Sequence, residues 1–225
     1  MSQPAASPLL PTIAFIGGGN MASAIIGGLI HQGHPASQIE VVEPWAEARE
    51  ALRKNYGIEA QAEAGPALQR AQIVVWAVKP QTFRDAAAQA KAHTQGALHL
   101  SVAAGIRSDS IAQWLGTERI VRTMPNTPAL VGKGMSALYA RPAVSAPERQ
   151  SIEAIMATTG EFLWVDSEPQ LDAVTALSGS GPAYVFYFLE AMTRAGTGMG
   201  LTEQQAHQLA VGTFVGASEL ARRSD

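Results

Sequence analysis

Apolar residues in the first two thirds of the chain fall into short continuous runs, and segments with helical periodicity separate these runs. Continuous runs, in contrast to alternating ones, are typical of parallel strands that are covered on both faces. We expect strands at 12–16, 39–42, near Ile58, 72–78, 97–102 and 119–123, and helices at about 22–30, 46–56, 64–70, 81–93 and 109–115. Residues 134–140 and 161–165 resemble edge strands around a helix at 146–158. This alternation predicts an α/β domain built on a doubly wound, mostly parallel sheet.

The pattern changes to helices alone from Pro169 onward. The segment 171–195 is apolar on nearly every side, whereas 202–223 is amphipathic. A helix that is apolar all round has to be buried all round, and the rest of this part is too short to cover it. A partner subunit is therefore expected. The predicted organisation is a disordered tail at 1–11, the α/β domain at 12–167 and an all-α C-terminal dimerisation domain at 168–225.

Composition and charge narrow the class of partner. The chain has 225 residues with 47% apolar content, which is enough for a substantial core. Its 16 basic and 19 acidic residues are spread along the chain and give a net charge of −3, so no nucleic-acid stripe or membrane patch is expected. Residues 173–189 are uncharged, but their glycines and proline favour a buried helix over a membrane span. The absence of cysteines excludes disulfides and thiolate sites but leaves the compartment undetermined. Residues 1–11 lack a signal-peptide pattern, so we expect a cytoplasmic protein that binds a small molecule.

A glycine-rich turn follows the first expected strand and opens a helix. Its pattern is G-x-G-x-x-A, from Gly17 to Ala22. Gly17 permits a tight turn, and Gly19 lets the backbone approach the phosphates of a dinucleotide at the start of the helix. Glu43 closes the second strand 21 residues after Ala22, where an acid that binds the adenosine ribose is expected. The turn predicts a Rossmann-type domain that binds a nicotinamide or flavin nucleotide, the alternative being the same fold without a ligand.

Three further segments offer polar groups where a ligand is expected. Lys79 follows the strand at 72–78 and could reach a phosphate or ribose, or could be a solvated lysine beside a helix-starting proline. Asn126 lies between two prolines after the strand at 119–123, in a rigid turn that is either a site or purely structural. Pro182 removes one hydrogen bond from an apolar helix and frees the carbonyl of Ser178, which indicates a site or a packing kink.

Several kinds of chemistry are not indicated. No hydrolase elbow, metal-ligand cluster or P-loop lysine motif occurs in the sequence. The five histidines are scattered, and His31, His34 and His93 are expected on helix ends or surfaces. No lysine follows Lys133, which argues against dehydrogenases that use a lysine of the helical domain as acid and base. The reaction should therefore need little proton transfer from side chains, and no catalytic residue is assigned.

Five sequence blocks together resemble one enzyme family. They are Phe-Ile-Gly-Gly-Gly-Asn-Met-Ala at 15–22, Ala-Val-Lys-Pro-Gln at 77–81, Ser-Val-Ala-Ala-Gly at 101–105, Arg-Thr-Met-Pro-Asn-Thr-Pro-Ala at 122–129 and Ala-Leu-Ser-Gly-Ser-Gly-Pro-Ala-Tyr at 176–184. Their order and spacing, over residues 12 to about 223, resemble pyrroline-5-carboxylate reductases. The resemblance implies reduction of 1-pyrroline-5-carboxylate to L-proline by NADPH or NADH, the last step of proline biosynthesis. It also implies a homodimer with interlocked helical domains, and leaves a higher oligomer open.

The same resemblance assigns roles to individual residues. It implies that the pyrophosphate is held by Ile16, Gly17, Gly18, Gly19, Asn20 and Met21. It implies that the cofactor is lined by Ala77, Val78, Lys79, Pro80, Ser101, Val102 and Ala103, with Asn126 near the nicotinamide. It implies that the substrate is bordered by Ser178, Gly179, Ser180, Gly181 and Pro182.

Two departures from the family pattern carry expectations of their own. Members often have a small or basic residue at the end of the second strand, whereas Glu43 would repel a 2′-phosphate and accept hydrogen bonds from a free ribose diol. The family also continues into a Ser-Pro-Gly-Gly-Thr-Thr-type loop that holds the substrate carboxylate, and this sequence ends at Asp225. Part of the substrate site is therefore expected outside these residues, and the helical domain is expected to be incomplete at its end.

Two other functions compete with this interpretation. One is a related Rossmann reductase of the 3-hydroxyacid dehydrogenase kind, which the missing lysine of the helical domain disfavours. The other is a nucleotide-sensing module that dimerises through its helices without catalysis. Turnover of pyrroline-5-carboxylate by the full-length protein separates all three.

Overall fold

The computed structural model describes residues 11–224 and divides the chain after Gly179 into two compact units. The first unit is an α/β domain and the second is a pair of helices. Apart from Pro11, the tail expected at 1–11 lies outside the described residues.

The first unit is built on one seven-stranded sheet with the strand order β2-β1-β3-β4-β5-β6-β7. The strands are β1 (Ile13–Ile16), β2 (Ile39–Val42), β3 (Ile73–Trp76), β4 (Leu98–Ser101), β5 (Ile120–Met124), β6 (Gly134–Ala140) and β7 (Gly160–Trp164). The pairs from β2 to β5 are parallel, β6 is antiparallel to β5, and β7 is parallel to β6. This is the doubly wound, mostly parallel sheet that the apolar runs predicted.

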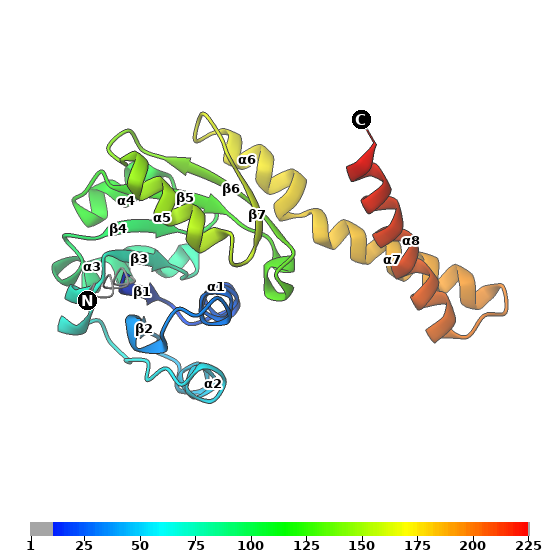
Figure 1. The fold of residues 1–225 in the computed structure, drawn as a ribbon, viewed down its shortest axis with the longest axis horizontal. Helices are drawn as coiled ribbons and strands as arrows, with labels where there is room; N and C mark the ends of the chain where they lie inside the picture. Colours follow the sequence, from blue (N-terminus) through cyan, green and yellow to red (C-terminus); the bar gives the residue numbers. More distant parts are fainter. Residues whose placement is uncertain (1–10, 225) are drawn as a thin grey trace, which may run out of the picture. The chain divides into compact units, whose positions relative to one another are not determined.

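Helices cover both faces of the sheet (Figure 1). On one face, α1 (Asn20–His31), α2 (Ala46–Tyr56) and α5 (Ala146–Met156) enclose a core that contains Phe15, Ile25 and Ile152. On the other face, α3 (Phe83–Ala90) and α4 (Ser108–Leu115) enclose a core that contains Trp76 and Phe83. Burial on both faces explains why the strands are apolar without alternation.

The structure corrects several details of the sequence prediction. Residues near Ile58 form no strand, although Gln61 makes an isolated bridge to Val42. The strand β6 lies inside the sheet instead of at its edge, because β7 adds to its outer side. The expected helix at 64–70 is a 3₁₀ segment, Pro66–Arg70, and that at 81–93 is α3 flanked by the 3₁₀ turns Pro80–Thr82 and Lys91–His93.

The long helix expected at 171–195 is interrupted. It consists of α6 (Gln170–Val174), a π-helical turn (Thr175–Gly179) and α7 (Gly181–Gly198). Pro182 is the second residue of α7. Proline cannot donate a main-chain hydrogen bond, so a regular helix cannot pass through this position unchanged. The division between the units lies at this interruption, whereas the helical pattern placed it after residue 167. The reason is that α6 packs against β5 and β6 and so belongs to the first unit.

The second unit consists of α7 and α8 (Glu203–Arg223), which cross each other (Figure 1). Thr202 and Gln205 form a capping box at the start of α8. A Cβ at Gly196 would lie 2.7 Å from the Cβ of Ala206, so the two helices meet closely there, and Phe188 packs on Phe214. Large apolar side chains elsewhere on both helices stay exposed in the single chain, including Phe186 and Leu209. Within residues 11–224, no helix has the length and apolar character needed to cross a membrane.

Candidate nucleotide-binding site

Most of the predicted cofactor residues lie along one edge of the sheet. The strands β2, β1, β3, β4 and β5 are parallel neighbours in that order, so the segments that follow them meet at the same edge. These segments carry Gly17, Gly18, Gly19, Asn20 and Met21 after β1, Glu43 after β2, Ala77, Val78, Lys79 and Pro80 after β3, Val102 and Ala103 after β4, and Asn126 after β5. The chain runs from β1 to β2 on one side and returns to β3 on the other, and this topological switch point is the place where doubly wound sheets bind ligands.

Gly17 lies at this switch point, directly after β1, in a conformation that only glycine adopts readily. Its φ is 97°, and a Cβ built on it would lie 2.5 Å from the carbonyl oxygen of Ala77. Main-chain hydrogen bonds hold both sides of the turn, from Gly17 to the carbonyl of Val42 at 2.8 Å and from Ala77 to that of Ile16 at 2.8 Å. The glycine is therefore required by the packing of the turn, as the motif predicted.

Gly19 is the N-cap of α1 and faces open space. A Cβ at this residue would meet no atom of residues 11–224 within 4 Å. No side chain caps the helix, and its first turn, which begins with Asn20 and Met21, contains no acidic residue. Free main-chain N–H groups and the positive end of the helix dipole favour an anion at such a position. These features fit the pyrophosphate of a dinucleotide.

Glu43 is buried, with 6% of its surface exposed, and its carboxylate binds the glycine turn. Its Oε2 accepts a hydrogen bond of 2.7 Å from the N–H of Gly18, and its Oε1 accepts one of 2.9 Å from the N–H of Trp45. The sequence predicted an acid beside the ribose but not this contact with the turn. A negative charge is thus fixed beside the segment that would hold the phosphates.

The segments after β3 and β4 contribute mainly backbone and small side chains. The Oγ of Ser101, the buried last residue of β4, accepts a hydrogen bond of 3.3 Å from the N–H of Ala103. Val102 donates its N–H to the carbonyl of Trp76 at 3.1 Å, which joins the two segments. Lys79 is exposed at the start of the Pro80–Thr82 turn, where it is accessible to a phosphate.

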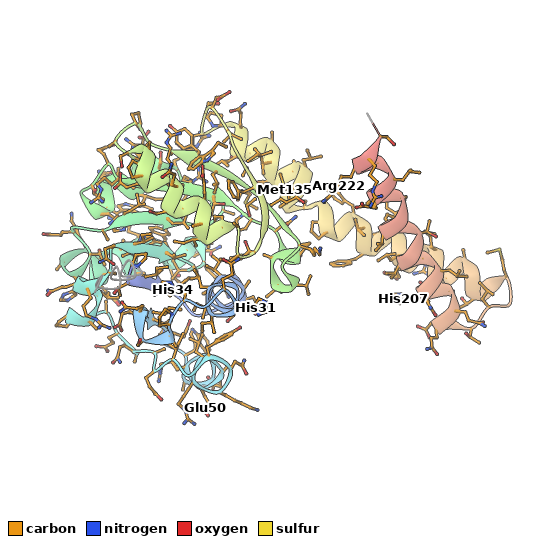
Figure 2. The ribbon with its side chains drawn as sticks, viewed as in Figure 1. His31, His34, Glu50, Met135, His207 and Arg222 are labelled. Atoms are coloured by element: carbon orange, nitrogen blue, oxygen red, sulfur yellow. The ribbon has the colours of Figure 1, made fainter. Side chains whose placement is uncertain are left out.

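Asn126 joins the segment after β5 to the π-helical turn. Its Nδ2 donates a hydrogen bond of 3.1 Å to the carbonyl of Ser178, while its Oδ1 accepts one of 2.9 Å from the N–H of Met135, which is labelled in Figure 2. A Cβ at Gly179 would lie 2.7 Å from the Cε of Met124, so this glycine also packs closely on the end of β5. The structure therefore brings Ser178 and Gly179 to the edge that carries the nucleotide residues.

The remaining predicted substrate residues belong to the second unit. Ser180 is the N-cap of α7, and Gly181 and Pro182 are its first two residues. None of the three accepts a side-chain cap hydrogen bond at this helix start.

Sequence reasoning missed a buried ion pair near the site. Arg122 on β5 contacts Glu168, with a distance of 2.7 Å between its Nη1 and the carboxylate Oε1. Glu168 also accepts hydrogen bonds from the N–H and Oγ of Ser108 at the start of α4. A single arginine inside an apolar strand was the available signal, because a buried guanidinium requires a partner.

Two histidines, His34 and His99, are buried. His34, which is labelled in Figure 2, was expected at a helix end or surface. It is buried, and burial lowers its pKa below the ordinary value. His99 lies inside the sheet, where its Nδ1 accepts a hydrogen bond of 3.0 Å from Nε1 of Trp76, and burial lowers its pKa to about 4. Among the described residues, no group of three or more His, Cys, Asp or Glu side chains is arranged to hold a metal ion.

Comparison with known proteins agrees with this arrangement. The family model described as pyrroline-5-carboxylate reductase dimerisation matches residues 168–225, and the model described as NADP oxidoreductase coenzyme F420-dependent matches residues 12–105. The pyrroline-5-carboxylate reductase of Pseudomonas aeruginosa is 45% identical over 217 residues, which cover 96% of this chain and 80% of that protein. That of Haemophilus influenzae is 41% identical, with coverage of 92% and 77%.

Solved structures show the same fold over nearly the whole chain. A pyrroline-5-carboxylate reductase from Coxiella burnetii superimposes with a TM-score of 0.88 at 36% identity, covering 96% of this chain and 81% of that one. The Plasmodium falciparum pyrroline carboxylate reductase, solved with NADP bound, gives a TM-score of 0.85 at 27% identity, with coverage of 96% and 80%. The residues at the strand ends, the glycine turn and the identity to these relatives together show that the chain belongs to the pyrroline-5-carboxylate reductase family.

Proposed function

We propose that the protein reduces 1-pyrroline-5-carboxylate to L-proline by hydride transfer from NADPH or NADH, as the last step of proline biosynthesis. The observation that carries this proposal is the edge of the sheet where the open start of α1 lies near the segment that Asn126 fastens to Ser178. The glycine turn on one side of this edge suits a dinucleotide. The other side offers the main chain of Ser178 and Gly179 and the hydrogen-bonded side-chain amide of Asn126.

The residues present fit a nicotinamide dinucleotide. Gly17 to Met21 would hold the pyrophosphate through main-chain N–H groups, and the segments at 77–80 and 101–103 would line the cofactor. When bound, the reduced nicotinamide supplies the hydride. The chain itself orients the two reactants and keeps the site apolar, since the lining segments contain mainly Ala and Val side chains.

Reduction of a cyclic imine requires little general acid catalysis from the protein. A cyclic imine is already electrophilic and can take its proton from solvent, so orientation of the C=N carbon contributes most of the rate. His99 does not suit a proton donor to a bound ligand, because it is enclosed within the sheet beside Trp76. We propose that residues 178–182 border the imine and assign no side chain as general acid.

We further propose that NADH is preferred over NADPH. The carboxylate of Glu43 is fixed by Gly18 and Trp45 at the end of β2, where the adenosine ribose is expected. A 2′-phosphate there would face a like charge in a partly closed site, whereas ribose hydroxyls could donate to the remaining lone pairs. The charge of Glu43 at this position therefore favours NADH over NADPH.

We propose a homodimer formed through the second unit. The large side chains Phe186 and Leu209 are about three fifths exposed in the single chain, at 61% and 60%. Burying each such side chain is worth about 1.5–3 kcal/mol, so a second copy that covers them is favoured. The match of residues 168–225 to a dimerisation model supports this proposal.

The deciding experiment is turnover of pyrroline-5-carboxylate by the full-length protein, with proline formation and nicotinamide oxidation measured together. A 3-hydroxyacid dehydrogenase would instead oxidise 3-hydroxyacids and leave the imine unchanged. A sensing module would bind NADH or NADPH without turnover of either substrate. Stoichiometric proline formation supports the proposal, and nucleotide binding without proline formation would overturn it.

A further inference from the structure

The ion pair between Arg122 and Glu168 connects the sheet to the segment that leads into the π-helical turn. The side chains are largely buried, at 6% and 12% exposure, and their charged atoms are 2.7 Å apart. Arg122 is on β5, and Glu168 precedes α6 by two residues. A pair this buried holds its two elements together firmly, because loss of either charge leaves the other uncompensated.

Ser108 fixes the orientation of the Glu168 carboxylate. Its N–H, at the first residue of α4, donates to Oε1 at 2.5 Å, and its hydroxyl donates to Oε2 at 2.9 Å. Burial alone would raise the pKa of Glu168, but the hydrogen bonds from Ser108 and Arg122 outweigh it and lower the pKa below the ordinary value. The Glu168 side chain therefore stays charged and accepts hydrogen bonds from both α4 and β5.

A second attachment lies at the other end of the same segment. Asn126 holds the carbonyl of Ser178, and Met124 packs against Gly179. From Arg122 to Asn126 the chain is extended and advances about 13 Å, since a strand rises about 3.3 Å per residue. From Glu168 to Ser178 it passes through a turn into the helix that begins at Gln170, and advances about 15 Å if each residue contributes the helical rise of about 1.5 Å. The two lengths match, so α6 and the π-helical turn run beside β5 between two fixed points.

We propose that Glu168 is a positioning residue for the reaction. It sets the placement of the π-helical turn, and hence of the Ser178 carbonyl and Gly179, against the nucleotide edge of the sheet. This inference rests on the proposed function in one respect, namely that residues 178 and 179 border the imine. Glu168 acts through its contacts with Arg122 and Ser108, not by touching a reactant.

The chain offers a matched control on the same segment. Asp172 pairs with Arg107 at 3.4 Å, but both side chains are more than half exposed, at 64% and 54%. Exposed pairs of this kind contribute little, since solvent screens them. Asp172→Asn removes one carboxylate four residues from Glu168 without opening the buried contact.

The test compares Glu168→Gln with Asp172→Asn in the protein. Hydrogen exchange over residues 170–179, nucleotide affinity, kcat and KM for the imine are measured for each. For Glu168→Gln we expect exchange in the π-helical turn to rise by about tenfold or more, because hydrogen bonds to a charged group are the stronger ones. We expect kcat/KM to fall by a similar factor while NADH affinity stays within about twofold. Asp172→Asn should match the unmodified protein.

Several outcomes would overturn the inference. One is a folded Glu168→Gln with unchanged exchange and unchanged kcat and KM. Another is an equal loss of nucleotide affinity, which would indicate general loosening of the sheet. If Glu168→Gln does not fold, Glu168→Asp keeps the charge and shortens the side chain, and a folded protein must show the same local increase in exchange. Failure of both to fold would make Glu168 a folding residue and refute the positioning role. If the unmodified protein reduces no imine, the proposed function fails, while the exchange measurement still decides whether Glu168 places the turn.

Discussion

The Nδ2 of Asn126 donates a hydrogen bond of 3.1 Å to the main-chain carbonyl of Ser178. In a regular helix this carbonyl would accept from the residue four positions later, which is Pro182 and has no N–H. Asn126 thus supplies the donor that the proline cannot. The two prolines that flank Asn126 hold it in the position from which it makes this contact.

Asn126→Ala should weaken both the turn and the reaction. It leaves the Ser178 carbonyl and the Met135 N–H without their partners, which costs about 1–3 kcal/mol for each buried group that water does not reach. We expect a lower melting temperature in thermal unfolding and a fall in kcat in the reductase assay. Thr127→Ala, at the exposed neighbouring residue, is the control. Equal kcat for the two variants would show that the amide has no part in placing the turn.

Two glycine substitutions should have opposite effects. Gly19→Val should abolish nucleotide binding yet keep the melting temperature, since its Cβ would enter open space at a φ of −73°. Gly17→Val should lower the melting temperature, since φ is 97° and its Cβ would overlap the Ala77 carbonyl. Calorimetric titration with NADH and NADPH, beside thermal unfolding, checks both. Undiminished affinity of Gly19→Val for both nucleotides would contradict the assignment of the turn.

The charge of Glu43 should decide between the two nucleotides. We expect the unmodified protein to bind NADH at least about tenfold more tightly than NADPH, since a like-charge contact of about 1.4 kcal/mol corresponds to that factor. Glu43→Gln should narrow the ratio of the two dissociation constants, and Glu47→Gln, an exposed charge on α2, should leave it unchanged. The ratio cancels any general disturbance of the turn. A strong NADPH preference in the unmodified protein would refute the proposal.

The free energy of unfolding should decrease as the pH is lowered from 6.5 to about 4, because of His99. Its pKa is lowered from 6.5 to about 4, chiefly by burial and further by Arg119, so the unfolded chain takes up a proton in this range before the native state does. Stability is therefore greatest above pH 6.5 and decreases as the pH falls towards 4, by up to about 3 kcal/mol.

Comparison with a substituted protein isolates this contribution. His99→Gln offers Trp76 an acceptor that does not titrate, so its free energy of unfolding should change less between pH 6.5 and 4. Denaturant unfolding at a series of pH values measures the difference. Parallel pH profiles for the two proteins would show that His99 is not the titrating group.

Charges placed on the exposed apolar surface of the second unit should separate the subunits. Phe186→Asp combined with Leu209→Asp introduces one charge on each of α7 and α8. We expect sedimentation to change from dimer to monomer, while nucleotide affinity is retained because the glycine turn belongs to the other unit. A dimer of undiminished stability would place the subunit interface elsewhere.

The sequence determined the fold of the first unit and the edge of the sheet that carries the glycine turn. Burial on both faces imposes continuous apolar runs, and the residues of the turn are dictated by local sterics at Gly17. The antiparallel placement of β6 and its position inside the sheet did not follow, because the apolar pattern of a strand does not specify its neighbours.

Only the tertiary structure decided the contacts that join distant residues. The sequence identified Pro182 as the residue that frees the Ser178 carbonyl, but not Asn126 as the donor 52 residues away. It placed Glu43 at the ribose position without its bond to Gly18, and it gave no partner for Arg122, which is Glu168. Local sequence patterns show which hydrogen-bonding groups and charges each residue carries. The pairing of buried polar groups depends on which elements the packing brings together.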